Sequence, residues 1–257
     1  MERNYAQKYY SADESGWWFL ARRDILWRLV KKISLGKKAE ILDYGCGGGY
    51  VIRSLNRQGY DNVYGLEISE EAVRVCRASG LNKVFLESDE FFKSKIGKFD
   101  AIIASDVIEH IQGDRNILAK WKKMLKSGGN VIIFVPAFNF LWDTHDIENQ
   151  HFRRYTKAGL KNLLEKEDFI VQRISYWNFV LFFPLLALIV AKKALYFLGL
   201  SGKKSDYPRL AFLNIHPPRF INGLLSFIIK VENIILDRMG INLPLGISVF
   251  AVAKLKK

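Results

Sequence analysis

Residues 39–50 read AEILDYGCGGGY and decide the fold. The run Ala39–Asp43 is short and apolar and ends in an acid, which is typical of a buried parallel strand. Three alternate glycines follow at once, and glycine permits positive φ and the close approach of a ligand to the backbone. The stretch predicts a strand, a ligand-binding turn and a helix whose first amide groups face the ligand.

The segments that follow alternate in the same way. Further strands are expected at residues 62–66, 83–86, 99–104, 131–135, 169–176 and 246–254. Helices are expected at residues 14–34, from the glycines to about 58, and at 69–79, 115–125 and 156–166. Alternation at this spacing predicts an α/β fold, a Rossmann-like doubly wound sheet with helices on both faces.

Ligands of such sheets lie at the carboxyl ends of the strands. This rule brings a set of residues to one rim: Asp43, Glu67, Asp89, Asp106 and Pro136. A nicotinamide loop would read G-x-G-x-x-G, whereas Tyr50 stands at the sixth position. Asp43 would repel a pyrophosphate but attract an ammonium group, and Glu67 can accept both hydroxyls of a ribose. These features indicate a nucleoside cofactor that carries an amino acid.

Five segments, taken in order, resemble class I S-adenosylmethionine-dependent methyltransferases of the small-molecule or lipid-acceptor type (type 11 or 12). They are the first motif Ile41–Gly49, the ribose motif Gly65–Ser69, the adenine position Ser88-Asp89, the fourth-strand segments Phe99–Ile103 and Asp106–His110, and the turn Leu125–Gly129. The resemblance covers residues 38–176. It implies seven strands, with the last strand antiparallel and inserted between the fifth and the sixth.

The resemblance implies S-adenosyl-L-methionine as cofactor and methyl transfer as activity. The cofactor-binding residues it implies are Asp43, Gly45, Cys46, Gly47, Gly49, Glu67, Ile68, Asp89, Ser105 and Asp106. Two of these have a simpler interpretation, since Asp89 can cap a helix and Cys46 can serve packing alone.

The segment after the fifth strand, residues 136–156, is the best candidate for acceptor chemistry. It holds two of the four histidines together with acids, arginines and aromatics. Candidate catalytic residues are His145, His151, Tyr155 and, after the fourth strand, His110. Candidate substrate-binding residues are Trp142, Asp146, Arg153 and Arg154. A histidine can act as a base near neutral pH, and the arginines can hold an anionic group.

A structural interpretation of the same residues competes. The histidines of this segment can cap loops, the arginines can pair with Asp143, Asp146 or Glu148, and His110 can be a hydrogen-bonded rim residue. No zinc-type spacing occurs, so no metal site is expected. The segment and the residues Trp17-Trp18-Phe19 with Arg22-Arg23 resemble a bacterial and archaeal subgroup. These aromatics either cover the cofactor or pack on the sheet.

Residues 177–245 form an apolar and basic helical insertion between the sixth and seventh strands, so the cofactor domain is expected at residues 1–176 plus 246–257. Phe179–Ala191 is strongly apolar but shorter than the roughly 20 residues that span a bilayer, which predicts a shallow or re-entrant helix. Residues 220–238 are amphipathic. Lys203, Lys204, Arg209 and Arg219 would meet anionic headgroups. The alternatives are a helical cap or a homodimer interface.

The net charge of +13 accompanies these apolar stretches and favours an anionic membrane surface as partner. The expected acceptor is hydrophobic or lipid-linked. A soluble metabolite or RNA as acceptor, or a non-catalytic membrane protein, are the alternatives. No Asn-Pro-Pro-Tyr motif is present, and no DNA partner is expected. Met1–Tyr5 shows no secretory signal. The expected location is the cytoplasm, peripheral or monotopic at the inner face of the membrane.

Overall fold

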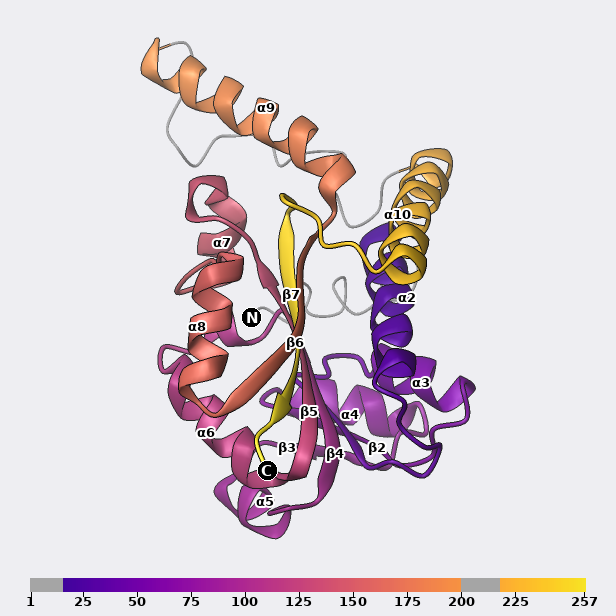
Figure 1. Cartoon of the computed structure of the whole chain (residues 1–257). Coiled ribbons are helices and arrows are strands. Elements are labelled where there is room, and N and C mark those ends of the chain that lie inside the picture. The colour runs from indigo at the N-terminus through magenta and orange to yellow at the C-terminus, as the bar shows by residue number, and fades with distance from the viewer. Residues whose placement is uncertain (1–15, 200–217) are drawn as a thin grey trace.

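The computed structural model describes residues 16–199 and 218–257. Its centre is a seven-stranded sheet in the order β3-β2-β1-β4-β5-β7-β6 (Figure 1). The strands are β1 Ile41–Tyr44, β2 Val63–Glu67, β3 Val84–Leu86, β4 Phe99–Ser105, β5 Leu125–Pro136, β6 Phe169–Trp177 and β7 Ser248–Leu255. β7 is antiparallel to β5 and β6, while the other neighbours are parallel. The predicted α/β fold and the inserted last strand are confirmed.

Helices cover both faces of the sheet (Figure 1). They are α2 Trp17–Lys32, α3 Tyr50–Arg57, α4 Glu70–Ala78, α5 Asp89–Ser94, α6 Asp114–Met124, α7 Thr144–Glu148, α8 Lys157–Lys166, α9 Phe179–Phe197 and α10 Arg219–Met239, with the 3₁₀ turns η1 Ile108–His110 and η2 Asn139–Leu141. Ser69 caps α4 as predicted, because its side chain accepts a hydrogen bond from the Ala72 N–H. The short helices α5 and α7 were not predicted.

Alternate residues of each strand enter two separate cores. Ile41 belongs to a core on one face that also contains residues of α2, α3 and α4. Leu42 belongs to a core on the other face that also contains residues of α5, α6 and α8. This alternation follows from the period of two along a strand. It explains why the central strands are apolar throughout: both of their faces are covered.

β5 begins earlier than its apolar run. Leu125 pairs with Phe99 and Asn130 with Ala101, so residues 126–129 bulge from the ladder with β4. Gly128 has φ +73° within this bulge. The sequence Ser127–Gly129 was expected to end the preceding helix, but it lies inside this distorted strand. The helix α6 ends earlier, at Met124.

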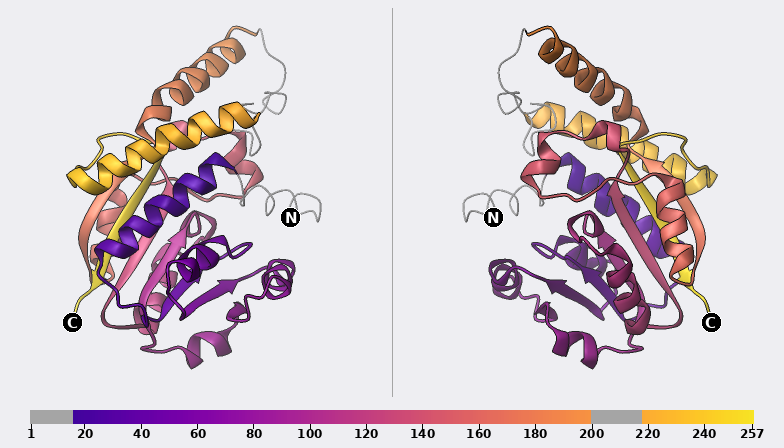
Figure 2. Two further views of the ribbon diagram at one scale, coloured as in Figure 1. Left: turned by 90° about the vertical axis from the view of Figure 1, so that its right-hand side faces the viewer. Right: turned by 90° about the vertical axis from the view of Figure 1, so that its left-hand side faces the viewer.

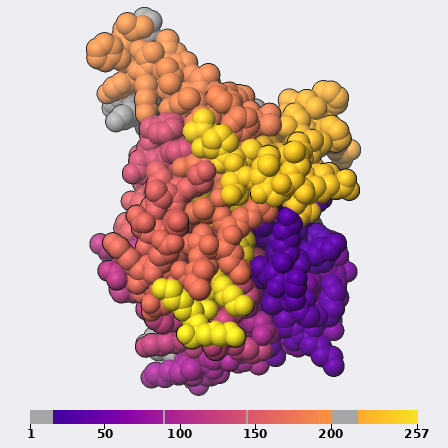
Figure 3. All heavy atoms as spheres, in the orientation of Figure 1, coloured from indigo at the N-terminus to yellow at the C-terminus, as the bar shows by residue number. Residues whose placement is uncertain are grey.

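α9 continues past the point where the sequence indicated an end. The predicted apolar stretch stopped at Ala191, but the helix includes Lys193 and ends at Phe197, for a total of 19 residues. Lysine is a good helix former, so its charge did not terminate the helix. By length and composition, α9 could cross a membrane, and 24% of its most apolar stretch is buried. It projects from the body of the molecule (Figures 1 and 3).

α10 packs against α2 rather than standing free (Figure 2). Its inner face includes Leu225, Ile229 and Leu236, which are buried in the core that contains α2. The Asn233 amide donates to the Ala21 carbonyl at 2.9 Å and accepts from the Trp177 indole N–H at 2.7 Å. One side of α10 is thus a helical cap of the protein, as the alternative interpretation held. Lys203, Lys204, Arg209 and Met1–Tyr5 lie outside the described residues.

The carboxyl ends of β5 and β6 share one rim of the sheet. β7 lies between these strands, and Ser248 pairs with Pro136 on one side and with Trp177 on the other. α9 starts two residues after Trp177. The apolar helix therefore leaves the sheet at the edge where ligands of this fold bind.

Candidate functional site

The predicted rim of acids exists at the ends of β1, β2 and β4. Asp43 is buried in β1, where it lies opposite Gly65 of β2 and Ile103 of β4. Glu67 ends β2, and Asp106 follows β4. Parallel strands in this register bring the three carboxylates to the same edge, beside the glycine loop.

The three predicted glycines all have positive φ: +73° at Gly45, +50° at Gly47 and +77° at Gly49. A Cβ at Gly45 would lie 2.7 Å from Val107 Cγ2, and one at Gly49 would lie 2.4 Å from Leu81 Cδ1. A Cβ at Gly47 would meet nothing within 4 Å. The outer two glycines are required by packing, whereas Gly47 borders open space in which a ligand can approach the backbone.

Glu67 holds this loop in place. Its Oε2 accepts the Gly47 N–H at 2.9 Å, and its Oε1 accepts the N–H groups of Ile68 and Ser69 at 2.8 and 3.0 Å. Ile68 is 79% exposed, which is unusual for an isoleucine and gives the rim an apolar platform. The carboxylate and the platform are adjacent, as a ribose and its base would require.

Cys46 is buried beneath the loop. Its hydrogen bond with Cys76, its burial and the nearby Asp43 raise the pKa of the Cys46 thiol well above its usual range. A thiol held neutral in this way is a poor nucleophile. The packing interpretation of Cys46 agrees with this environment.

The remaining predicted cofactor residues take different places. Ser105 donates to Asp106 Oδ2 at 3.2 Å, and Asp106 itself has φ +59°. Such a backbone conformation is uncommon outside glycine and clusters at functional sites. Asp89 begins α5, but the cap of that helix is Ser88, whose hydroxyl accepts the Phe91 N–H at 3.1 Å. The Asp89 side chain lies outside the described part of the structure.

The N-terminal aromatics pack on the sheet. Trp18 contacts Trp17 and Trp177, with ring centroids 5.6 and 5.1 Å apart. Arg22 is buried, and its guanidinium lies 4.2 Å from the Phe134 ring centroid and 3.3 Å from Asp106 Oδ2. Trp17 and Trp18 thus follow the packing alternative, while Arg22 reaches the rim and pairs with Asp106.

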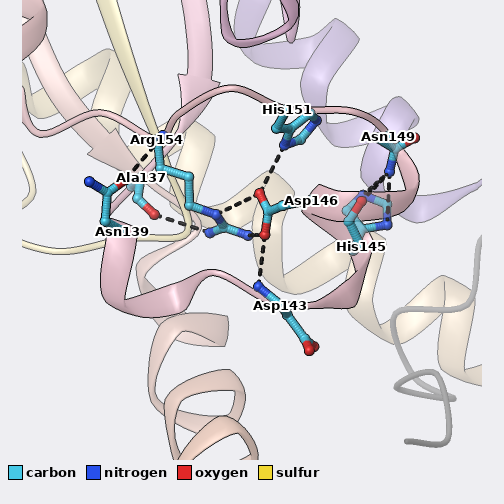
Figure 4. A network of polar contacts seen from close by, with 8 residues as sticks. All are labelled: Ala137, Asn139, Asp143, His145, Asp146, Asn149, His151 and Arg154. Atoms are coloured by element: carbon cyan, nitrogen blue, oxygen red, sulfur yellow. Dashed lines mark hydrogen bonds and ion pairs between the residues drawn. The ribbon is translucent and has the colours of Figure 1, made fainter. Parts of the chain in front are cut away.

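Asp146 is the centre of a polar network in the segment after β5 (Figure 4). This fully buried carboxylate binds Arg154 through both oxygens, at 2.8 Å each, and accepts from His151 Nδ1 at 2.8 Å. Burial alone would raise the pKa of Asp146, but the hydrogen bonds from His151 and Arg154 lower it well below its usual range. Arg154 is paired as the structural alternative foresaw, so Asp146 and Arg154 shape the segment from within.

Asp114 organises Arg153 and Tyr155 in a similar way. Its Oδ2 accepts from Arg153 Nη1 at 2.9 Å and from the Tyr155 hydroxyl at 3.1 Å. Burial and the Asp114 charge raise the pKa of Tyr155 well above its usual range. Tyr155 therefore stays protonated and is a poor candidate for an acid or base.

The histidines divide into a pair and an outlier. The rings of His110 and His151 lie 4.6 Å apart between centroids. His145 lies 6.3 Å from His151, is exposed and is hydrogen-bonded to Asn149 at 3.1 Å (Figure 4). Trp142 is half-buried between η2 and α7. Of the four catalytic candidates, the structure brings His110 and His151 together.

Glu109 joins this pair and was not singled out from the sequence. Its side chain is fully buried, and neither carboxyl oxygen has a hydrogen-bond partner on any other described residue. Burial and the Asp106 charge raise the pKa of Glu109 well above its usual range. The only sequence signal was its place beside His110 within the fourth-strand motif, which does not reveal that it is buried.

Comparison with known proteins identifies the family of the chain. Residues 18–174 match the model of a methyltransferase domain family. The ubiquinone biosynthesis O-methyltransferase of Erwinia tasmaniensis is 33% identical over 102 residues, which are 37% of this chain and 41% of that protein. The enzyme of the same name from Xylella fastidiosa is 27% identical over 156 residues, or 54% of this chain and 62% of that protein. The chain thus spans less than two thirds of these relatives.

Solved structures share the fold. The methyltransferase solved with the Haloferax volcanii Trm112 methyltransferase activator superposes with a TM-score of 0.61 at 14% identity, over 99% of this chain and 95% of that one. An S-adenosylmethionine-dependent methyltransferase of Archaeoglobus fulgidus superposes with a TM-score of 0.53 at 20% identity, over 90% of this chain and 94% of that one. The family match covers the glycine loop, the rim and the His110–His151 pair. The chain belongs to the class I S-adenosylmethionine-dependent methyltransferases.

Proposed function

We propose that this chain transfers the methyl group of S-adenosylmethionine to a hydroxyl of a hydrophobic or lipid-linked acceptor at a membrane surface. The exposed apolar surface of α9 and α10 is the observation that supports a hydrophobic acceptor. It lies beside the cofactor rim, because α9 leaves the sheet there. We further propose residues 177–245 as the acceptor-side unit, inserted into a cofactor domain of residues 1–176 and 246–257.

The cofactor half of the proposal assigns roles to the rim. Asp43 would hold the ammonium group, Glu67 the ribose hydroxyls and Ile68 the adenine face. The open space at Gly47 lets the amino-acid part lie against the backbone. S-adenosylmethionine supplies an activated methyl group, and the protein's task is then to hold the acceptor oxygen in line with it.

α9 supports the acceptor class through its position and composition. Its inner side packs on the segment after β5, where the Phe182 ring centroid lies 5.9 Å from Phe138 and 6.3 Å from Phe140. Its outer side exposes Phe183 and Val190, which are 51% and 56% accessible. An apolar molecule or bilayer on the outer side would lie against a helix that itself packs on the acceptor segment.

α10 adds a second apolar face. Exposed apolar residues recur at helical spacing along it: Phe220, Leu224, Phe227, Val231, Ile235 and Met239. The opposite side of the helix is the one buried against α2. A helix that is apolar on two sides needs a second apolar neighbour, and large exposed patches of this kind mark membrane or protein contacts. The chain's positive charge favours an anionic membrane.

The names of the relatives support the same acceptor class. Ubiquinone biosynthesis O-methyltransferases are named for methyl transfer to oxygen in ubiquinone biosynthesis. A hydroxyl on an apolar molecule is an acceptor that both the rim and the two apolar helices would accommodate.

A labelled-methyl assay tests the proposal. The full chain is incubated with methyl-labelled S-adenosylmethionine and, in parallel, with total lipids or total RNA from the source cell. We expect label in the solvent-extracted lipid fraction and none in RNA. Label in RNA or in an aqueous metabolite, with none in lipids, would overturn the acceptor class.

A pair of matched variants tests the role of α9. Phe183→Glu with Val190→Glu places charges on its exposed face, and Ile96→Glu places one at an exposed apolar residue before β4. We expect the α9 variant to lose flotation with anionic vesicles and most lipid methylation while still binding S-adenosylmethionine. The Ile96 variant should resemble the wild type, and equal flotation by both would contradict the role of α9.

A further inference from the structure

We propose that Glu109, His110 and His151 bind a divalent transition-metal ion of the zinc class. One ligand atom from each residue lies within 4.8 Å of the other two. Glu109 and His110 come from η1, which follows β4, while His151 comes from the loop after α7. Small side-chain rotations would bring all three atoms to one ion, for which Zn–N and Zn–O distances are about 2.0–2.2 Å.

Glu109 supplies an independent reason to expect a cation. Its carboxyl group is fully buried, and no other described residue donates a hydrogen bond to either oxygen. Buried polar groups are nearly always satisfied, and an orphaned one calls for an explanation such as an ion. Asp106, whose charge acts on Glu109, is already paired with Arg22 at 3.3 Å. A metal ion between the carboxylate and the two histidines would provide the missing partner.

His151 is oriented as a metal ligand. Its Nδ1 lies 2.8 Å from Asp146 Oδ1, and this carboxylate can only accept, so Nδ1 carries the proton. The lone pair of the neutral ring is then on Nε2. A carboxylate behind a histidine is the usual outer partner of a metal-bound imidazole. Arg154 fixes Asp146 in turn through two hydrogen bonds of 2.8 Å.

The donor set indicates the class of metal. Two imidazoles and one carboxylate match the His₂Glu set of catalytic zinc sites, which leave a coordination position open. Two nitrogen ligands are less suited to Ca²⁺ or Mg²⁺, which favour all-oxygen sites. His110 is exposed, so an ion can enter from solvent and the open position can face an acceptor.

The location links the ion to the methyl-transfer site. A Cβ at Gly45 would touch Val107, so the residue two positions before Glu109 packs against the cofactor loop. This link rests on the proposed function. The acceptor hydroxyl would bind the ion and release its proton to water. Its oxygen would then form the new bond to the methyl carbon, while the C–S bond breaks and its electron pair stays on sulfur, giving S-adenosylhomocysteine.

Metal binding is tested without turnover. The full chain is freed of metal with a chelator. One portion is dialysed against Zn²⁺ and assayed for bound metal, while Co²⁺ is added to a separate metal-free portion and its visible absorption recorded. We expect one ion per chain and an intense Co²⁺ spectrum typical of four or five ligands. Absence of stoichiometric Zn²⁺, with only weak octahedral Co²⁺ absorption, would overturn the site and leave the cluster as an acid–base group.

Three variants locate the ion. Glu109→Gln and His151→Ala should each weaken Zn²⁺ binding by more than about 100-fold, beyond the 10–100-fold that outer partners cost. His145→Ala removes a histidine of the same segment that lies outside the cluster, and it should bind Zn²⁺ as the wild type does. Equal loss in the His145 variant, or no loss in the other two, would contradict the assignment.

Thermal unfolding shows whether a variant that fails to bind Zn²⁺ is still folded. Zn²⁺ should raise the Tm of the wild type and of His145→Ala but leave that of Glu109→Gln unchanged. Metal-free Glu109→Gln should be at least as stable as the metal-free wild type, because it removes a buried unpaired carboxyl. Calorimetry with S-adenosylmethionine distinguishes failure of the metal site from failure of the proposed function. If the chain binds the cofactor but not Zn²⁺, the metal site is refuted and the proposed function is not. If it binds Zn²⁺ but not the cofactor, the methyl-transfer function is refuted.

Discussion

Single residues determine where the glycine loop leaves space for a ligand. Gly45 and Gly49 are confined by Val107 and Leu81, whereas the space outside Gly47 is open. Glu67 accepts the Gly47 N–H and thereby fixes the loop before any ligand arrives. The loop is thus preorganised by packing on one side and by a carboxylate on the other, which lowers the entropic cost of binding.

Alanine at two of these glycines should therefore have different effects. Both residues have positive φ, which costs a non-glycine residue about 1–2 kcal/mol. Gly47→Ala should lose little more stability than this but should lose most S-adenosylmethionine affinity, because the new methyl group occupies the open space. Gly49→Ala also clashes with Leu81 and should lose about 2–4 kcal/mol.

Urea unfolding and calorimetry with S-adenosylmethionine check this pair. If Gly47→Ala bound the cofactor with wild-type affinity, the open space would not be the binding site. If the two variants were equally stable, the packing role of Gly49 would be refuted.

At the scale of elements, α10 joins the insertion to the rest of the fold. Glu232 accepts the N–H groups of Asn178 and Phe179 through Oε1, at 2.7 and 3.2 Å, and that of Val180 through Oε2 at 3.2 Å. These are amide groups at the start of α9, which have no partner within the helix. α10 therefore fixes both α2 and the point from which α9 leaves the sheet.

The charge of Glu232 gives this contact a pH dependence. Burial raises the pKa of Glu232 in the folded state, while the three N–H groups partly oppose the rise. Because the pKa of Glu232 is higher in the folded than in the unfolded state, Glu232 stabilises the fold more at low pH. This contribution is fully present below the unfolded pKa, near 4.3–4.5, and is lost as the pH rises through the folded pKa. Glu232→Gln keeps Oε1 but cannot accept from Val180, which should cost about 1 kcal/mol.

The stability of the wild type minus that of Glu232→Gln should therefore decrease between pH 4 and pH 7. Urea unfolding of both proteins at the two pH values measures this difference and cancels the contribution of other groups. A difference that stays constant or increases with pH would show that Glu232 does not titrate as its burial requires.

The sequence predicted elements well where local signals agree with burial. The apolar runs found every strand, and the glycine loop with Asp43 and Glu67 located the rim. The sequence was less informative for α10. Glu232 looked like an interruption of an amphipathic helix, but it is buried and accepts hydrogen bonds from the start of α9. The sequence also missed that Glu109 and His151, from separate segments, meet in space. Such contacts depend on how the chain folds back, which no local pattern encodes.

For the whole molecule, a cofactor site and an apolar surface share one end of the sheet. Pro136, Ser248 and Trp177 lie side by side across β5, β7 and β6, and α9 begins just beyond them. The exposed sides of α9 and α10 extend this end outward (Figures 1 and 3). On the proposed function, an acceptor dissolved in a membrane would reach the methyl group from this side without crossing the sheet.

Calorimetric titration of the full chain and of Asp43→Asn with S-adenosylmethionine tests directly whether the rim binds the methyl donor. We expect one site per wild-type chain. We expect at least about 30-fold weaker binding by the variant, because losing one member of a buried charge pair costs about 2–5 kcal/mol. Wild-type affinity in Asp43→Asn, or no binding by the wild type, would contradict the claim that this rim binds the methyl donor.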